Sequence, residues 1–296
     1  AADGTTCSGS GWRMEFSAVP SYLQPGVRVG ATAAGTTTSF VAPGDVANLA
    51  LGNPSQYCDA SPELATTTFI GGTPSGNPLP TVQSFAYDVG TTSTSSNNGI
   101  SYHDHPHTFH ANFDEVGPTR GYAFHRRTNT LIGGAYARRH AGYPAGAPGI
   151  SDNDGPDQIY LVRRDGSAPS VFFSAEAGSD AHDYTNMLAD NGFWDHVGKS
   201  GWGNIELSED ESTLYAANLF DRLIYVVDVS IVGGLPVAGA HTTIDVSTQA
   251  RAQCGLDDDA GDCNGDDNDF VVGFAKESDG ELYVGVTCTA EHSRLV

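Results

Sequence analysis

Apolar and polar residues alternate in short runs along the second half of the chain, and polar turns separate the runs. The clearest example spans residues 203–219 and 221–228, with an acidic turn between two apolar runs. Similar stretches occupy residues 121–136 and 272–286. Because alternation with a period of two marks half-buried strands, the pattern predicts three antiparallel hairpins, each resembling part of a β-propeller blade.

The first of these stretches continues into a second pair of predicted strands. Residues 158–173 hold two apolar runs around an Asp165-Gly166 turn, which would complete a four-stranded blade. Aligned leucines, Leu131, Leu214 and Leu282, recur 83 and then 68 residues apart. Blades need only ~40 to 50 residues. Long insertions should therefore decorate one face of the fold, and loops are where function is commonly found.

The predicted fold is all-β and propeller-like, with several four-stranded antiparallel blades, long loops and an incomplete ring. Residues 1–100 are rich in Gly, Thr, Ser and Pro, with short strands expected in 12–19, 67–70 and 82–87, and should contribute strands to the propeller. Residues 101–296 would form the blades. Since a closed ring needs at least ~4 blades, the sequence favours a fragment of a longer protein over an edge that another chain covers.

Composition narrows the class of protein. The 14 Lys and Arg residues face 36 Asp and Glu residues, which gives a net charge of −22. Such a charge repels nucleic acid and anionic lipid and favours cations. No long apolar run is present, so membrane insertion is not expected.

The chain opens with small residues, as a mature exported protein does after signal cleavage, so a secreted or cell-surface location is expected. Five cysteines agree with an oxidising compartment. The preferred disulfides are Cys7–Cys58 and Cys254–Cys263, the second stapling an acidic loop. Cys288 would then be free or bonded to something outside the chain. The alternative is that all five are reduced and packed.

A histidine-rich run occupies residues 102–110. If the run is extended, His103, His105 and His107 project from one side and two or three imidazoles could hold zinc or another transition metal. Such a site could be structural or hydrolytic. Pro106 places the run on a sheet edge or in a loop, and a solvated polar loop is the alternative.

Two acidic loops point to calcium, which we favour over a transition metal. Carboxylate and amide oxygens recur at spacings that suit a hard cation, while an ordinary solvated turn is the alternative. The longer loop only partly matches an EF-hand, because its glycine is displaced and no glutamate stands at the twelfth position. The candidate ligands are Asp262, Asn264, Asp266, Asn268 and Asp269 in one loop, and Asp152, Asp154 and Asp157 in the other.

No catalytic motif stands out. The sequence has no Gly-x-Ser-x-Gly elbow, no Walker phosphate loop and no His-Glu-x-x-His helix. Two adjacent pairs, His182-Asp183 and Asp195-His196, flank a loop that contains Asn186, Asp190 and Trp194, where a lactonase-like propeller enzyme would hold calcium. Surface and packing roles are favoured for these residues, and Arg138, Arg139 and His140 are expected to hold neighbouring loops in place through carboxylates.

Residues 121–142, 195–204 and 285–291 resemble exported bacterial surface proteins with SdrD B-like modules. The resemblance covers roughly residues 50–296. It implies a propeller-like region that precedes repeated β-sandwich modules in an adhesive or structural protein. It supplies no catalytic residues. The sequence departs from that family because it contains no sandwich modules and because the histidine-rich run has no counterpart there.

Three functions follow from these observations. The favoured one is a non-catalytic, adhesin-like binding or structural module with calcium-stabilised loops, which binds an extracellular ligand or a neighbouring surface protein. The second is a metal-dependent hydrolase that uses the histidine cluster. The third is a subunit of an extracellular assembly, a homo-oligomer included, in which a neighbouring chain completes an exposed sheet edge.

Overall fold

The computed structural model describes residues 12–20, 23–25, 37–42, 44, 47–52, 62–87, 107–144, 155–254, 270–278 and 280–288. The protein is mostly β-structure, as predicted. Two compact units are present, one formed by residues 1–63 and 86–90 and the other by residues 64–85 and 91–296. Within the described part of the chain, none of the helices has the length and apolar character needed to span a bilayer.

The first unit contains two small antiparallel sheets. Strand β1 (Trp12–Glu15) pairs with β3 (Thr38–Val41), and β2 (Gln24–Pro25) pairs with β4 (Leu51–Gly52). Strands of two to four residues bury little apolar surface, and the residues of β1 are all exposed. The strand expected at 12–19 is present over its first four residues as β1, and the other three strands of these small sheets were not predicted.

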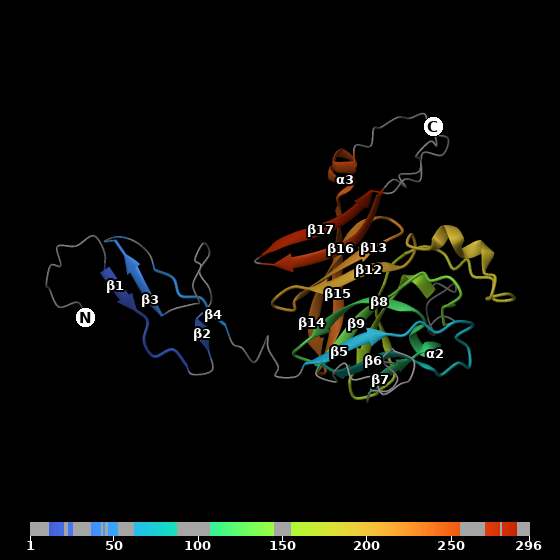
Figure 1. Cartoon of the computed structure of the whole chain (residues 1–296), viewed down its shortest axis with the longest axis horizontal. Helices are drawn as coiled ribbons and strands as arrows, with labels where there is room; N and C mark the ends of the chain where they lie inside the picture. Colours follow the sequence, from blue (N-terminus) through green and yellow to red (C-terminus); the bar gives the residue numbers. More distant parts are fainter. Residues whose placement is uncertain are drawn as a thin grey trace, which may run out of the picture. The chain divides into compact units, whose positions relative to one another are not determined.

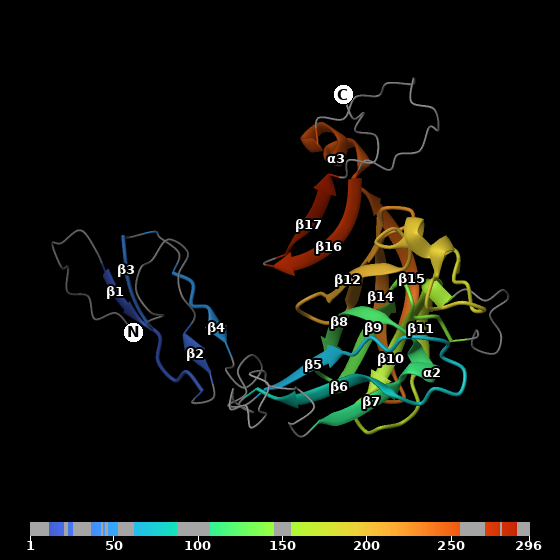
Figure 2. The ribbon, with the colours of Figure 1, turned by 45° about the vertical axis from the view of Figure 1, so that its right-hand side comes forward.

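The second unit is a series of antiparallel sheets that follow one another in chain order (Figures 1 and 2). The first sheet has three strands, β5 (Glu63–Thr67), β6 (Pro80–Ala86) and β7 (Thr108–Asn112). The second has four, β8 (Thr119–His125), β9 (Thr130–Ala135), β10 (Gln158–Arg163) and β11 (Ser170–Ser174). The strand expected at 82–87 is largely confirmed as β6, whereas a strand at 67–70 is wrong, because β5 ends at Thr67. Both strands join the second unit.

The third sheet also has four strands, β12 (Trp202–Leu207), β13 (Thr213–Asn218), β14 (Leu223–Val232) and β15 (Leu235–Asp245). The last sheet pairs β16 (Phe270–Ser278) with β17 (Glu281–Cys288). Helices are short: α2 (Phe113–Val116), α3 (Ser247–Cys254) and the 3-10 turns η2 (Gly155–Asp157) and η3 (Asn191–His196). The three predicted hairpins are confirmed as β8–β9, β12–β13 and β16–β17, and β10–β11 complete the predicted four-stranded sheet.

Three separate hydrophobic cores lie between successive sheets. Val82 and Ala111 of the first sheet pack with Tyr160 and Val162 of the second. The opposite face of the second sheet contributes Ile159 and Leu161 to a core with Trp202, Ile205, Leu214 and Val227 of the third. Ala217 and Ile224, from the other face of the third sheet, pack with Phe270, Val272 and Ala275 of the last. Alternation along each strand therefore sends side chains into two cores, one on each face.

Glycines bring the first strands of the last three sheets into close backbone contact. Gly121, Gly203 and Gly273 occupy equivalent positions in β8, β12 and β16, each at an irregularity in the strand pairing. A Cβ on Gly121 would clash with the carbonyl oxygen of Gly203, and one on Gly203 would lie 2.7 Å from that of Gly273. No larger residue fits at the first two positions.

Candidate functional site

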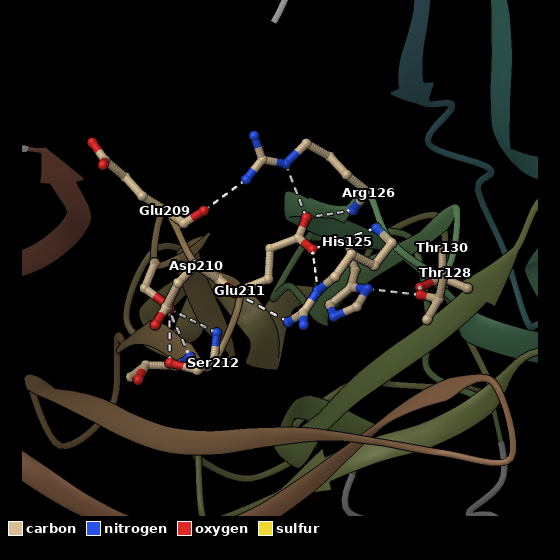
Figure 3. Close-up of polar contacts among 11 residues, drawn as sticks. His125, Arg126, Thr128, Thr130, Glu209, Asp210, Glu211 and Ser212 are labelled. Atoms are coloured by element: carbon tan, nitrogen blue, oxygen red, sulfur yellow. Dashed lines mark hydrogen bonds and ion pairs between the residues drawn. The ribbon is translucent and has the colours of Figure 1, made fainter. Parts of the chain in front are cut away.

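A buried carboxylate joins the turns of neighbouring sheets. Glu211, in the β12–β13 turn, lies against Arg126 in the β8–β9 turn (Figure 3). Its Oε1 accepts hydrogen bonds from the backbone N–H (2.6 Å) and Nε (3.0 Å) of Arg126, and its Oε2 accepts from the Nε of Arg127 (2.9 Å). Although burial raises the pKa of Glu211, these hydrogen bonds outweigh it and the net pKa is lowered.

The backbone around Glu211 is shaped for this contact. Glu211 has a φ of 61°, a conformation rare for a residue with a side chain. Beside it, the Asp210 carboxylate accepts hydrogen bonds from the hydroxyls of Ser208 and Ser212 and from the Ser212 amide, which lowers its pKa to about 2. The contacts continue to the last sheet, where Glu277 accepts from the Glu209 amide (2.8 Å). These hydrogen bonds link the turns of neighbouring sheets, and they occupy the polar groups of Glu211, Arg126 and Arg127 with one another.

The loop between β11 and β12, residues 175–201, is the best candidate for a functional surface. It is one of the long insertions that the repeat spacing predicted, and it contains η3. Its anchor is Asp190, which is completely buried and has a left-handed φ of 41°. The Oδ2 of Asp190 accepts from the His140 amide and from Nδ1 of His182, both at 2.8 Å, and Oδ1 accepts from the Asp183 amide at 3.0 Å. The Asp190 carboxylate thus joins residues 182 and 183 to residue 190 within the loop, and it also joins the loop to the backbone of His140.

Aromatic rings surround this anchor. The imidazole of His182 stacks on Phe193 with ring centroids 3.6 Å apart, and the ring of Tyr143 lies at 5.4 Å. The hydroxyl of Tyr184 donates to Asp180 (2.7 Å) and accepts from the Tyr143 amide (3.0 Å). Nε2 of His182 is buried with no hydrogen-bond partner. His182 packs among aromatic rings, as expected, and no local pattern indicated that its partner would be Asp190 rather than the adjacent Asp183.

Arg139 and His140 hold this loop, as predicted, whereas the guanidinium of Arg138 lies over the ring of Phe69. Arg139 donates to the carbonyl oxygens of Ala189 and Asp190, and its guanidinium lies 3.9 Å from the ring centre of Trp194. The Nδ1 of His140 contacts the carbonyl oxygen of Met187 at 2.7 Å. Most of these bonds use carbonyl oxygens and rings, where carboxylates were expected. The loop backbone is therefore held at several points along its length.

Among its polar residues, the anchored loop exposes several large apolar side chains to solvent. Leu188 is 94% exposed and Trp194 is 61% exposed, and Tyr184 and Val197 are also exposed. A fixed backbone that displays large apolar side chains loses little conformational entropy when it binds. Exposed apolar groups gathered on one segment mark interaction sites. The loop is therefore suited to binding.

A pH-dependent loss of stability is expected from the anchor. Hydrogen bonds from His140, Asp183 and His182 outweigh the effect of burial and lower the pKa of Asp190. The ionised carboxylate therefore stabilises the fold above the unfolded-state pKa of about 3.9, and this contribution is lost as the pH falls through the lower folded-state value. We expect Asp190→Asn to cost about 2 kcal/mol at neutral pH, measured by urea denaturation.

Between pH 5 and pH 3 the same variant should lose less stability than the wild type, since it lacks the titrating group. Asp195→Asn serves as the control, because Asp195 is an exposed carboxylate in the same loop. Parallel stability profiles for the wild type and Asp190→Asn would contradict the role of Asp190.

The predicted metal ligands fall mostly outside the described residues. These are His103, His105, Asp152, Asp154, Asp262, Asn264, Asp266, Asn268 and Asp269. Of the other two, Asp157 in η2 accepts a hydrogen bond from the Ala177 amide (2.7 Å), and His107 lies between the rings of Phe85 and Phe109. In the part that the structure describes, no group of three or more His, Cys, Asp or Glu residues is arranged to hold a metal.

The cysteine prediction needs a correction. Cys288, the last residue of β17, is disulfide-bonded, so the expectation that it is free or bonded outside the chain is wrong. The side chains of Cys7, Cys58, Cys254 and Cys263 lie outside the described residues.

Sequence reasoning missed Glu211 and Asp190 as anchors because their partners are distant in the chain. Arg126 is 85 residues from Glu211, and His140 is 50 residues from Asp190. Comparison with protein-family models, with curated proteins and with solved structures finds no match to this chain. The resemblance to SdrD B-like surface proteins therefore stays a prediction.

Proposed function

We propose that this chain is a non-catalytic binding or structural module of an exported or cell-surface protein, and that it binds through the loop of residues 175–201. The observation that carries the proposal is the contrast within that loop. Its backbone is fixed by the buried Asp190 carboxylate, while Leu188 and Trp194 point into solvent. Rigid loops on a β scaffold are a common way to present a binding surface.

The scaffold in this proposal is an arc of a β-propeller. Three findings support that arrangement: the sheets are antiparallel meanders, each core is shared by two successive sheets, and the first strands β8, β12 and β16 lie next to one another. A propeller places the first strand of every blade around its centre. Calcium ordering of the acidic loops at 151–157 and 255–269 is part of the same proposal, in keeping with the net charge of −22.

A binding assay with loop variants tests this function. The wild type is expected to bind at least one immobilised extracellular polymer in a panel of mucin-type glycans, cell-wall polysaccharide and collagen. Leu188→Asp and Trp194→Ala should each weaken that binding tenfold or more, about 1.4 kcal/mol, because they remove exposed apolar contacts. Measurements in calcium and in a chelator show whether binding depends on ordered acidic loops.

Val232→Asp is the matched control, since Val232 is 61% exposed at the tip of the β14–β15 hairpin, outside the loop. It should bind as the wild type does, and both Leu188→Asp and Val232→Asp should unfold at the wild-type temperature, whereas Trp194→Ala also loses the contact with Arg139. Binding that is equally strong in Leu188→Asp and Trp194→Ala would remove the loop from the proposal. Ester hydrolysis that requires zinc and is lost in His105→Ala would favour the hydrolase instead.

A further inference from the structure

The outer edge of the third sheet has no strand beside it in the described part of the chain. Strand β15 is the last strand of that sheet and pairs only with β14. Alternate residues of an antiparallel strand direct their backbone N–H and C=O groups to opposite sides, so the groups of β15 that point away from β14 have no strand partner there. Residues 239–245 are all exposed, which agrees with an open edge. Further sheets would not cover this edge, because successive sheets pack through their faces.

Much of this edge lacks the features that prevent edge strands from pairing with other chains. Natural edge strands are kept short, or they carry charged side chains, prolines or bulges. Strand β15 has 11 residues, and it contains no Asp, Glu, Lys or Arg before Asp245, its last residue. Pro236 and an irregularity in the pairing at residues 238–241 interrupt only its first half. The regular open segment is therefore His241–Asp245, which we call the β15 edge.

The β15 edge is complementary to a second copy of itself that runs antiparallel to it. A twofold axis at Thr243, the middle residue of the edge, places each Thr243 opposite its counterpart and each His241 opposite Asp245 of the other copy. Opposite residues of an antiparallel pair lie about 5 Å apart on the same face, so an imidazole N–H of His241 can donate to that carboxylate. The two Asp245 carboxylates are roughly 13 Å apart along the strands, which exceeds the Debye length of about 8 Å.

The distribution of charge favours this segment as the place where two copies meet. A chain with a net charge of −22 repels other copies of itself. Residues 229–244, which make up most of the β14–β15 hairpin, contain no Asp, Glu, Lys or Arg. Two copies can therefore approach each other along this hairpin without bringing carboxylates together.

We propose that two copies of this chain pair through the β15 edge, antiparallel and around a twofold axis at Thr243, so that their four-stranded third sheets join into one continuous sheet. Backbone hydrogen bonds between the two β15 strands supply the affinity, as in other cases of strand addition. The contact between His241 and Asp245 fixes the register. Because both copies use the same surface, the assembly is closed at two copies.

The mass of the intact chain in solution, measured by light scattering over a roughly hundredfold range of concentration, tests this pairing. We expect the wild type to reach twice 30.9 kDa and to grow no further. Thr243→Lys and Thr243→Glu each place like charges directly opposite each other across the axis, which destabilises an antiparallel pair. Each should raise the dissociation constant tenfold or more. Since Thr243 is exposed within one copy, both variants should keep their fold, as checked by circular dichroism and urea denaturation.

Mixing the two variants tests the register. An equimolar mixture of Thr243→Lys and Thr243→Glu should recover the dimer, because a lysine then lies opposite a glutamate. Thr248→Lys is the matched control. Thr248 is an exposed threonine in α3, outside the β15 edge, so this variant should pair as the wild type does.

Three results would overturn the proposal. The first is a wild type that stays monomeric at every concentration, or that grows beyond two copies. The second is a dimer that Thr243→Lys leaves unchanged, which would place the interface elsewhere. The third is a mixture of the two charged variants that stays monomeric, which would exclude a twofold axis at Thr243. None of these results affects ligand binding by Leu188 and Trp194, so this proposal and the proposed function fail separately.

Discussion

Gly203→Ala is expected to lose about 3 kcal/mol or more of folding stability, or to prevent folding. The new methyl group would lie 2.7 Å from the carbonyl oxygen of Gly273 and 3.2 Å from its Cα. Because these are backbone atoms of a paired strand, they cannot turn aside as a side chain would, and overpacking of this kind costs about 1 to 3 kcal/mol or more. Urea denaturation of dilute protein measures the loss.

Gly273→Ala is the matched control for that substitution. It changes the same residue type, at the equivalent position of the next strand, but the added methyl group meets nothing within 4 Å. Its cost should be below about 0.5 kcal/mol. Equal losses in the two variants would show that strand propensity, and not the close approach of β12 and β16, requires glycine.

Glu211→Ala is expected to cost about 3 kcal/mol. The substitution leaves two arginines and two backbone amides without the acceptor that they share, and removing one partner of a buried ion pair costs about 3 to 5 kcal/mol. The lower end applies, because the side chains of Arg126 and Arg127 are 38% and 55% exposed and water can replace part of the contact. Thermal and urea unfolding measure the effect.

Glu206→Gln provides the comparison for Glu211. The Glu206 carboxylate pairs with Lys276 between the third and last sheets, but that lysine side chain is 52% exposed. Exposed pairs contribute about 0 to 1 kcal/mol, so this variant should remain close to the wild type. If Glu206→Gln and Glu211→Ala were equally mild, the turn network would have no special role in holding the sheets together.

The sequence predicted those features of the fold that depend on residues close together in the chain. The hairpins β8–β9, β12–β13 and β16–β17 follow from alternation within about 15 residues and from polar turns, and those were predicted correctly. Most neighbouring strands within the four-stranded sheets are joined by short connections, which favour antiparallel pairing. The exception is β9 and β10, which pair across residues 136–157. Local pattern was sufficient for these elements.

The site was less predictable because its contacts are long-range. Asp190 resembles any loop aspartate in the sequence, and only the folded chain brings His140 and His182 to its carboxylate. The adjacent pair His182-Asp183 indicated the correct loop, but the carboxylate that binds His182 is that of Asp190 and not that of Asp183. Exposure of Leu188 was also not evident, since an apolar residue in a loop is as easily buried as exposed. The acidic calcium loop at 262–269 lies outside the described residues, so its assignment remains a prediction.

The division of the described hydrophobic interior into three cores affects how readily the chain can gain or lose a whole sheet. Because each core is shared by adjacent sheets only, the stability of one sheet depends on its immediate neighbours and hardly on those farther away, as in a one-dimensional array. Duplication or loss of a whole sheet then disturbs two boundaries and leaves the remainder intact. Gene rearrangements that add or remove one such unit should therefore be tolerated more readily than insertions of the same length within a strand.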